Sequence, residues 1–365
     1  MKILLTNATD IFAGGEDYVL VLASQLRRRG HEVWVSALPG HLLLAKCAAR
    51  DLPTLPLEYR GMSRVFHVAG QLRRAMRAQG IQIVHSNANY DRTAAAFAAA
   101  GTGIAHVAGV HSTHSIQHNV THWIRNRWLT RHFITDADAG KRVLVEDDGI
   151  APSRVTTVPI GIEVPAPGHR EAARARIRSA LGVADHTLVV GNVARLVPFK
   201  GHRVLLEAAS IVLRQRPDVL FVIVGDGELE EELRHRAHEH GILPSIRFLG
   251  FRDDLDDLYA GFDLYCHSSL ELAAEMFPIA ILRALGAGLP VVCTAVGGIG
   301  AMVREGASGH LVPPDDPPAL ARALEGVLES PSQRRSMGEA GFQHFLARYH
   351  ASAMAAGIEE VYRTL

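Results

Sequence analysis

The stretch that decides the fold runs from residue 264 to residue 293 and reads LYCHSSLELAAEMFPIAILRALGAGLPVVC. It opens on one short apolar run, Leu264 to Cys266, and closes on another, Pro290 to Cys293. Between them, Pro278 is well suited to begin a helix, and a glycine-proline turn leads into the second run. Strand, helix and strand in this order are typical of a βαβ unit, whose two strands lie parallel.

The same alternation of short apolar runs and longer helical patterns continues along the chain. In the first half the runs are Ile3 to Thr6, Val33 to Ser36 and Ile81 to His85. The pattern restarts after residues 158–168, which are dense in proline and glycine, with runs that include Thr187 to Val193, Leu220 to Val224, Ile246 to Leu249 and His310 to Val312. We therefore predict an α/β fold of two doubly wound parallel-sheet domains facing across a cleft, at residues 1–165 and 166–345, followed by a helix-like segment at 346–365.

The composition excludes several classes of protein. The chain has 365 residues, with 38 Lys+Arg against 38 Asp+Glu, so no net charge draws it to nucleic acid. Its 48% of hydrophobic residues is typical of a globular protein with a large core, and no apolar run approaches the ~18 residues that cross a bilayer. We expect no signal peptide, and the three widely spaced cysteines, Cys47, Cys266 and Cys293, favour a reducing cytoplasm.

Charge is divided unevenly between the two halves. Residues 1–165 hold 18 Lys+Arg and 13 Asp+Glu, a net charge of +5, and the remainder hold 20 and 25, a net charge of −5. One segment of the basic half interleaves aromatic and basic side chains: Trp123, Arg125, Arg127, Trp128 and Arg131. Such a segment suits a peripheral contact with an anionic membrane. The alternative, which we favour from the sequence, is a solvated helix with two buried tryptophans.

Candidate ligand contacts follow the apolar runs, because ligands of open parallel sheets bind at the carboxyl ends of the strands. Arg195 and Lys200 come after the run that ends at Val193, on a loop before a helix. Two cations beside the N-terminus of a helix would hold a diphosphate well. The alternative interpretation is a pair of solvent-exposed loop charges.

Glycines also follow two of the runs, where they let the backbone approach a ligand. They are Gly14 with Gly15, and Gly225 with Gly227. The first pair does not form G-x-G-x-x-G, and no acidic residue is clearly placed about 20 positions later, which disfavours a nicotinamide-dependent oxidoreductase. Before Pro278, acidic residues would accept hydrogen bonds from the hydroxyl groups of a sugar.

Two groups of residues resemble metal ligands. His111, His114, His118 and His122 are spaced by 3, 4 and 4 residues, and Asp136 with Asp138 forms an Asp-x-Asp. The histidines make a site only on a helix of suitable geometry, and the acidic pair is interpreted as the start of a helix, where carboxylates complement the helix dipole. We therefore predict no metal centre.

Taken together, these motifs resemble those of glycosyltransferase family 4, a retaining family with the GT-B fold of two Rossmann-like domains. The resemblance covers nearly the whole chain and keeps the order of the motifs. The matching pieces are Lys2 to Leu5 with Gly14-Gly15, Arg29 to Val33, Val110-His111, Ile160 to Glu163, Arg195 to Gly201, Val224 to Gly227, Phe248 to Phe251, Glu275 to Pro290 and Val296 to Gly298.

The resemblance implies a role for the matched positions of the second domain. Arg195 and Lys200 would bind the diphosphate of a UDP, GDP or ADP sugar and stabilise the charge on the departing phosphate. Glu275 would contact hydroxyls of the transferred sugar, together with the backbone near Phe277 and Ile279. Gly225 and Gly227 would lie against the nucleotide.

The resemblance also implies how the reaction proceeds. His111 would face the donor sugar near the reacting carbon, and Gly14 and Gly15 would approach the donor or the acceptor. A front-face displacement would retain the anomeric configuration, with the leaving phosphate taking the proton of the acceptor and with neither metal nor cofactor. The acceptor would be a glycan or a lipid-linked molecule in the synthesis of cell-surface polysaccharide or lipopolysaccharide, made in the cytoplasm or at the inner face of the membrane. Residues 346–365 would cross back to the first domain.

One position departs from the family pattern. Family members carry a second Glu eight residues after the first, where it binds the ribose hydroxyls, and here that position is Arg283. A guanidinium cannot accept those hydrogen bonds, so Arg283 would instead pair with Glu271 or another carboxylate, or meet a phosphate. This departure motivates an alternative function, a catalytically weak or inactive subunit that binds sugar nucleotides.

Overall fold

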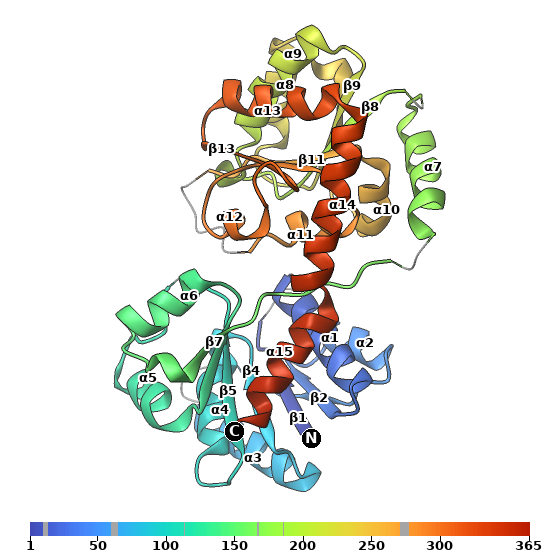
Figure 1. The fold of residues 1–365 in the computed structure, drawn as a ribbon. Coiled ribbons are helices and arrows are strands. Elements are labelled where there is room, and N and C mark those ends of the chain that lie inside the picture. Colours follow the sequence, from blue (N-terminus) through green and yellow to red (C-terminus); the bar gives the residue numbers. More distant parts are fainter. Residues whose placement is uncertain (10–13, 60–64, 113, 166–167, 185, 271–276) are drawn as a thin grey trace. The chain divides into compact units, whose positions relative to one another are not determined.

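A computed structural model describes residues 1–9, 14–59, 65–112, 114–165, 168–184, 186–270 and 277–365 (Figure 1). The chain divides into two units. Unit 1 consists of Met1–Glu163 and Arg348–Leu365, and unit 2 is the continuous segment Val164–Ala347. The sequence analysis placed the corresponding boundaries after residues 165 and 345.

Unit 1 is built on a seven-stranded sheet with the order β3-β2-β1-β4-β5-β6-β7, in which every pair of neighbours is parallel. The register pairs Leu4 with Trp34 on one side of β1 and with Val84 on the other. The strands are β1 (Lys2–Thr6), β2 (Glu32–Ala37), β3 (Thr54–Pro56), β4 (Ile83–Ser86), β5 (Ala105–Val110), β6 (His132–Thr135) and β7 (Val155–Thr157). The chain runs outward from β1 to β3 and then outward from β4 to β7, so the strand order reverses between β1 and β4.

The helices of unit 1 connect consecutive strands and bury their apolar side chains against the sheet. Helix α1 shows the pattern, because Val19, Leu22 and Leu26 are fully buried at helical spacing. The α-helices are α1 (Gly14–Arg28), α2 (Leu42–Ala48), α3 (Val65–Gln79), α4 (Asn89–Ala99), α5 (Val120–Ile124), α6 (Asp138–Arg142) and α15 (Ala351–Arg363). Two π-helical turns, η2 (Arg125–Leu129) and η3 (Val143–Asp147), continue α5 and α6, and η4 (Pro152–Arg154) is a 3₁₀ turn.

Unit 2 repeats this architecture with a six-stranded parallel sheet of order β10-β9-β8-β11-β12-β13. Its strands are β8 (Leu188–Val193), β9 (Val219–Val224), β10 (Ile246–Phe248), β11 (Leu264–His267), β12 (Val291–Thr294) and β13 (Gly309–Val312). Strand β9 is buried along its whole length, as expected of a strand covered by helices on both faces. The order reverses between β8 and β11.

The helices of unit 2 lie between these strands. They are α7 (His169–Leu181), α8 (His202–Gln215), α9 (Glu230–Glu239), α10 (Leu255–Gly261), α11 (Ile279–Gly286), α12 (Ile299–Met302), α13 (Pro317–Glu329) and α14 (Pro331–Arg348), with short 3₁₀ turns η5 (Pro198–Lys200) and η6 (Leu243–Ser245). Phe221, Leu264 and Leu324 belong to one buried apolar cluster that joins the sheet to α8 and α13. The predicted α/β fold of two doubly wound parallel sheets is confirmed.

The last segment of the chain, Arg348–Leu365, packs on unit 1. His350 forms an isolated parallel bridge with Ile162, and α15 lies beside α1 (Figure 1). The carboxylate of Glu359 on α15 pairs with Arg29 and with Arg363. The segment therefore completes unit 1, although 184 residues of unit 2, Val164–Ala347, precede it in the chain.

The two tryptophans of residues 120–129 are not buried, so the favoured interpretation of that segment is wrong. Trp123 is 46% exposed and Trp128 is 69% exposed. The buried residues there are polar, since Arg125 and Asn126 face the interior of unit 1. No helix within the described ranges is both long and apolar enough to span a membrane.

We expect Gly161→Ala to loosen the C-terminal segment from unit 1. A Cβ atom at this position would lie 2.7 Å from the carbonyl oxygen of His350 and 2.9 Å from the Cα of Ala351, and backbone cannot rotate away as a side chain can. The expected cost is about 1 to 3 kcal/mol of unit 1 stability. Tryptophan fluorescence in a urea titration measures it, because Trp34, Trp123 and Trp128 all lie in unit 1. Gly70→Ala, on the open side of α3, is the control; equal midpoints for the two variants would contradict the close approach.

Buried neutral histidines make unit 1 sensitive to acid. Burial, then repulsion from Arg125, Arg92 and His85, holds the pKa of His106 far below 6.5, and its ring nitrogens meet the hydroxyls of Ser86 and Thr130. The unfolded chain protonates this histidine below pH 6.5 and the folded chain does not, so stability is lost as pH falls below 6.5.

We expect a loss of about 2 kcal/mol for each such histidine at pH 5 relative to neutral pH. The urea midpoint of the tryptophan signal, measured from pH 7.5 to pH 5, should therefore fall more steeply for the wild type than for His106→Gln. His67→Gln, at an exposed position of α3, should keep the wild-type slope. A His106→Gln slope equal to the wild type would show that His106 is not the titrating group.

Candidate functional site

The carboxyl edge of the unit 2 sheet gathers the predicted cations and glycines. Strands β9, β8, β11 and β12 are neighbours and parallel, so the loops that follow them meet at one edge. Arg195 follows β8, is exposed, and pairs with no other described residue. Lys200 is partly exposed at the end of η5, with its Nζ atom 5.2 Å from the centre of the Phe199 ring.

Two glycines set the path of these loops. Gly201 has φ +67°, and a side chain there would overlap the carbonyl oxygen of Ser268. Gly225 has φ +135°, and a side chain would overlap the carbonyl oxygen of Ala194. Gly227 lies against Leu196 in the same way. The predicted glycines therefore hold the loop after β8 against the loops after β9 and β11.

Hydrogen bonds between neighbouring loops stiffen this edge. The Ser268 hydroxyl donates to the carbonyl oxygen of Lys200 at 3.0 Å, and the Leu270 amide donates to Phe199 at 2.7 Å. The Thr294 hydroxyl at the end of β12 donates to the carbonyl oxygen of Ser269 at 2.6 Å. The loop after β11 thus holds the backbone of Lys200 in place through these hydrogen bonds, and a preorganised anion contact requires such support.

A neutral histidine lies behind Lys200. His202, the first residue of α8, is fully buried, and within the described chain neither of its ring nitrogens has a hydrogen-bond partner. Burial, with the neighbouring His267 and Lys200, lowers its pKa to about 3. His202 therefore adds no positive charge to this edge at neutral pH.

Helix α11 begins at the same edge. Pro278 is its N-cap and Ile279 its first residue, as expected from the sequence, and Phe277 is partly buried just before them. The amide groups of the first turn face this end of the helix, and they favour an anion. Glu275, predicted to contact sugar hydroxyls, lies outside the described residues, as does Glu271.

Arg283 forms an ion pair on the other end of α11. Its Nη1 atom lies 2.5 Å from Oδ1 of Asp256 on α10, and its side chain is 22% exposed. Burial raises the pKa of the nearby Tyr259 phenol, and the positive charge of Arg283 offsets part of that rise. A carboxylate was among the partners considered from the sequence, and the carboxylate of Asp256 does pair with Arg283.

In unit 1, His111 lies at the carboxyl edge of the sheet, immediately after β5. Its Nδ1 atom is 3.4 Å from Oδ2 of Asp136, which follows β6, and its ring packs edge-on against Tyr18 at 4.6 Å. The Asp136 carboxylate is 3% exposed. A buried carboxylate this close to an imidazole limits the orientations that the ring can adopt.

A second histidine lies next to His111. His85 at β4 donates or accepts a hydrogen bond of 2.6 Å with the hydroxyl of Tyr362 on α15. A Cβ atom on Gly109 would be 3.0 Å from Nε2 of His85, 3.0 Å from Oδ1 of Asn87 and 3.2 Å from Nε2 of His111. Any larger residue at 109 would be tight against these three polar atoms, so the glycine gives them room to converge.

Gly14 and Gly15 open helix α1 and are exposed. The first turn of this helix continues with Glu16 and Asp17. Glu16 is buried and accepts a hydrogen bond from Thr9, so its carboxylate is held at the end of the β1 loop rather than presented to solvent. The two glycines thus leave backbone accessible beside a buried acid.

No metal centre forms among the residues that the structure describes, since it brings no three histidine, cysteine or acidic side chains together. Asp138 begins α6, as the sequence predicted, and bonds the Thr157 hydroxyl at 2.9 Å.

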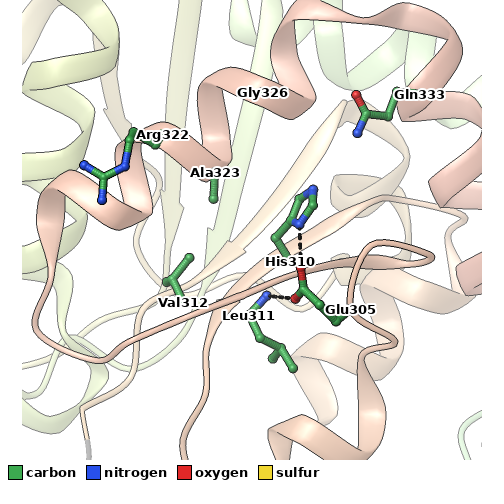
Figure 2. A pocket seen from close by; sticks show the side chains of 8 residues that line it. All are labelled: Glu305, His310, Leu311, Val312, Arg322, Ala323, Gly326 and Gln333. Atoms are coloured by element: carbon green, nitrogen blue, oxygen red, sulfur yellow. Dashed lines mark hydrogen bonds and ion pairs between the residues drawn. The ribbon is translucent and has the colours of Figure 1, made fainter.

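A separate pocket of about 320 Å³ lies beside β13 in unit 2 (Figure 2). Glu305 there accepts a hydrogen bond from Leu311 and is bonded to His310, which outweighs the effect of burial and lowers its pKa. Arg322, Ala323, Gly326 and Gln333 complete the lining, and none of the predicted site residues is among them.

Sequence reasoning missed several residues of the unit 1 site. Asp136 was considered only as a metal ligand or helix start, although its place directly after an apolar run was a usable signal. His85 was assigned to a strand without a role. Tyr18 and Tyr362 carried no local signal, because their contacts depend on segments far away in the chain.

Comparison with known proteins identifies the family of the chain. Two family models match, one described as "Glycosyltransferase Family 4" over residues 12–164 and one as "Glycosyl transferases group 1" over residues 173–344. Together they cover most of both units, apart from the C-terminal segment Arg348–Leu365 of unit 1.

Two relatives illustrate the range of similarity. A D-inositol 3-phosphate glycosyltransferase of Corynebacterium urealyticum is 37% identical over 63% of the chain, and the match spans about half of that relative, 55%. A phosphatidyl-myo-inositol mannosyltransferase of Mycolicibacterium smegmatis is 30% identical over 98% of the chain and 91% of the relative.

Among solved structures, Anabaena HepE in complex with UDP covers the whole of both chains with a TM-score of 0.86 at 21% identity. The same protein in complex with UDP-glucose gives a TM-score of 0.82. At 21% identity the likeness to HepE shows the fold alone. The family models and the match to the mannosyltransferase rest on sequence similarity, and they show the family. The chain belongs to glycosyltransferase family 4.

Proposed function

We propose that this protein transfers a sugar from a nucleotide-diphosphate donor to a glycan or lipid-linked acceptor, with retention at the anomeric carbon and without a metal ion. The observation that carries the proposal is the arrangement at the carboxyl edge of unit 2. There Arg195 and Lys200 stand on glycine-held loops beside the start of α11, which is how a diphosphate is bound.

The donor chemistry follows from these groups. The diphosphate lies against Arg195 and Lys200, and their charges stabilise the leaving phosphate as the bond to the sugar breaks. An oxygen of the leaving phosphate takes the proton of the acceptor hydroxyl. At the same time the acceptor oxygen bonds to the anomeric carbon on the face that the phosphate leaves. His111, with its ring oriented by Asp136, contacts the sugar from unit 1. A uridine nucleotide is the first donor to test, because HepE, which shares the fold, is solved with UDP and UDP-glucose.

The acceptor is proposed to be lipid-linked. The support is the relative that matches over 98% of the chain, whose name gives it a phosphatidylinositol acceptor. Synthesis of a cell-surface polysaccharide or lipopolysaccharide fits both kinds of acceptor. The configuration of the product, read by NMR from the coupling at the anomeric carbon, tests the mechanism, and an inverted product would exclude front-face displacement.

A second candidate function is a sugar-nucleotide-binding subunit with little or no catalysis. The observation that favours it is the Arg283–Asp256 ion pair, which occupies a position where family members carry a ribose-binding Glu. The two candidates differ in turnover. Nucleotide release from a bound donor supports the transferase, whereas binding without release in the wild type, together with release after Arg283→Glu, supports the subunit.

We expect Lys200→Ala to weaken nucleotide-diphosphate binding by roughly 10-fold to 100-fold, because a charge-assisted hydrogen bond contributes about 1.5 to 3 kcal/mol. Calorimetric titration of the whole chain with UDP, GDP and ADP, without metal and then with magnesium, measures this change. Lys46→Ala, a lysine on α2 of unit 1, is the matched control and should leave the affinity unaltered. If Lys200→Ala binds as tightly as the wild type, the diphosphate is held elsewhere; if no nucleotide binds the wild type, the proposed function fails.

A further inference from the structure

The segment of residues 120–129 carries its apolar side chains on the outside. Helix α5 and the turn η2 form one continuous helical segment, since Ile124 (φ −58°, ψ −49°) and Arg125 (φ −53°, ψ −54°) both keep helical dihedral angles at the junction. Four of its large apolar side chains are exposed: Val120 (73%), Trp123 (46%), Ile124 (36%) and Trp128 (69%). A helix that only covers a core has the opposite pattern, with its apolar face buried.

Buried hydrogen bonds fix this orientation. The Arg125 guanidinium donates to the Thr93 hydroxyl at 2.9 Å, to the carbonyl oxygen of Ile116 at 2.8 Å and to the Asn126 side chain at 2.9 Å. Rolling the segment to bury the tryptophans would break all three bonds and leave a charge to be paired again. The apolar face is therefore held outward by the fold.

Cationic side chains flank the apolar ones. Arg127 and Arg131 are exposed, and Arg127 lies over the Trp128 ring at 5.8 Å. Arg154 donates to the carbonyl oxygens of Asn126 and Thr130, and, after burial, the charges of Arg127 and Arg131 lower its pKa. In the described chain no carboxylate pairs with these three guanidiniums. We call Val120, Trp123, Ile124, Arg127, Trp128 and Arg131 the tryptophan-arginine face.

We propose that the tryptophan-arginine face docks the protein on the surface of a bilayer that contains anionic lipids. The tryptophans and their apolar neighbours enter the interfacial layer, which is where the amphipathic indole ring is most stable. The unpaired guanidiniums meet lipid phosphate groups, and they bind phosphate in the same fork geometry as carboxylate. This inference does not depend on sugar transfer.

The size and charge of the face favour a membrane over a protein partner. Ten helical residues span about 15 Å and are about 10 Å wide. A stable protein interface buries about 800 Å² on each partner, far more than this face offers, and its core is depleted of unpaired charge. A second copy would moreover bring like charges together if the face packed on itself. A bilayer needs only a few interfacial aromatic side chains with cations beside them.

Co-sedimentation of the whole chain with lipid vesicles tests the proposal. Vesicles of phosphatidylcholine alone are compared with an equimolar mixture of phosphatidylcholine and phosphatidylglycerol at low salt. We expect the wild type to sediment with the anionic vesicles, and to be released at roughly 0.5 M salt, where charges are screened within a few ångströms. Two double variants should each partition onto the anionic vesicles about tenfold less strongly, or weaker still. One combines Trp123→Ser with Trp128→Ser, and the other combines Arg127→Gln with Arg131→Gln.

Two further measurements separate the outcomes. Phe251→Ser, which removes an equally exposed aromatic side chain from unit 2, should bind anionic vesicles like the wild type. In a Trp34→Phe background, tryptophan emission should shift to shorter wavelength on anionic vesicles, because only Trp123 and Trp128 then remain.

A wild type that stays in the supernatant at low salt would overturn the proposal, as would unchanged binding by the double tryptophan variant. A concentration-dependent dimer in sedimentation velocity that disappears in that variant would assign the face to a second copy instead. Because Trp123, Trp128, Arg127 and Arg131 are exposed, unchanged circular dichroism is expected of the two double variants and shows that loss of binding is not loss of fold.

Discussion

At Gly201 and Gly225 two loops of unit 2 pass so close to neighbouring backbone that a hydrogen atom is the only side chain that fits. The first contact ties the end of η5 to the loop after β11, and the second ties the start of the loop after β9 to the loop after β8. The proposed binding of a diphosphate by Arg195 and Lys200 depends on these contacts, because they hold the loops after β8, β9 and β11 together. The position of both cations is then set by backbone geometry.

The fold was predictable because its signals are local. Apolar runs such as Val219–Val224 and helix starts such as Pro278 need no distant partner to be recognised, and the structure places them as expected. Strands β3 and β7, of three residues each, are among those that the sequence analysis did not list, and they have too few positions to show a period. The prediction that Trp123 and Trp128 are buried was wrong. It followed the general preference for burying indole rings, and no local signal overruled that preference.

The placement of the candidate residues was predictable in unit 2. Arg195, Lys200 and the glycines sit within a few residues of strand ends, so the topology of a parallel sheet was enough to gather them. The contacts around the candidate residues of unit 1 join residues far apart in the sequence, such as His85 and Tyr362, which are 277 residues apart. The side chain that pairs with Arg283 was also out of reach, because Asp256 lies on another helix and no periodicity links the two.

The division of unit 1 into two pieces has a consequence for biosynthesis. A ribosome delivers residues in order, and domains generally fold as units while the chain is made. Unit 2 is one continuous stretch and can fold as soon as residue 347 is available. Unit 1 is started first, yet it lacks the partner of Arg29 until Glu359 emerges and the partner of His85 until Tyr362 emerges. The earlier-made domain is therefore the one completed last, and its unfinished edge beside α1 is the part of the nascent protein that most needs protection from misassembly.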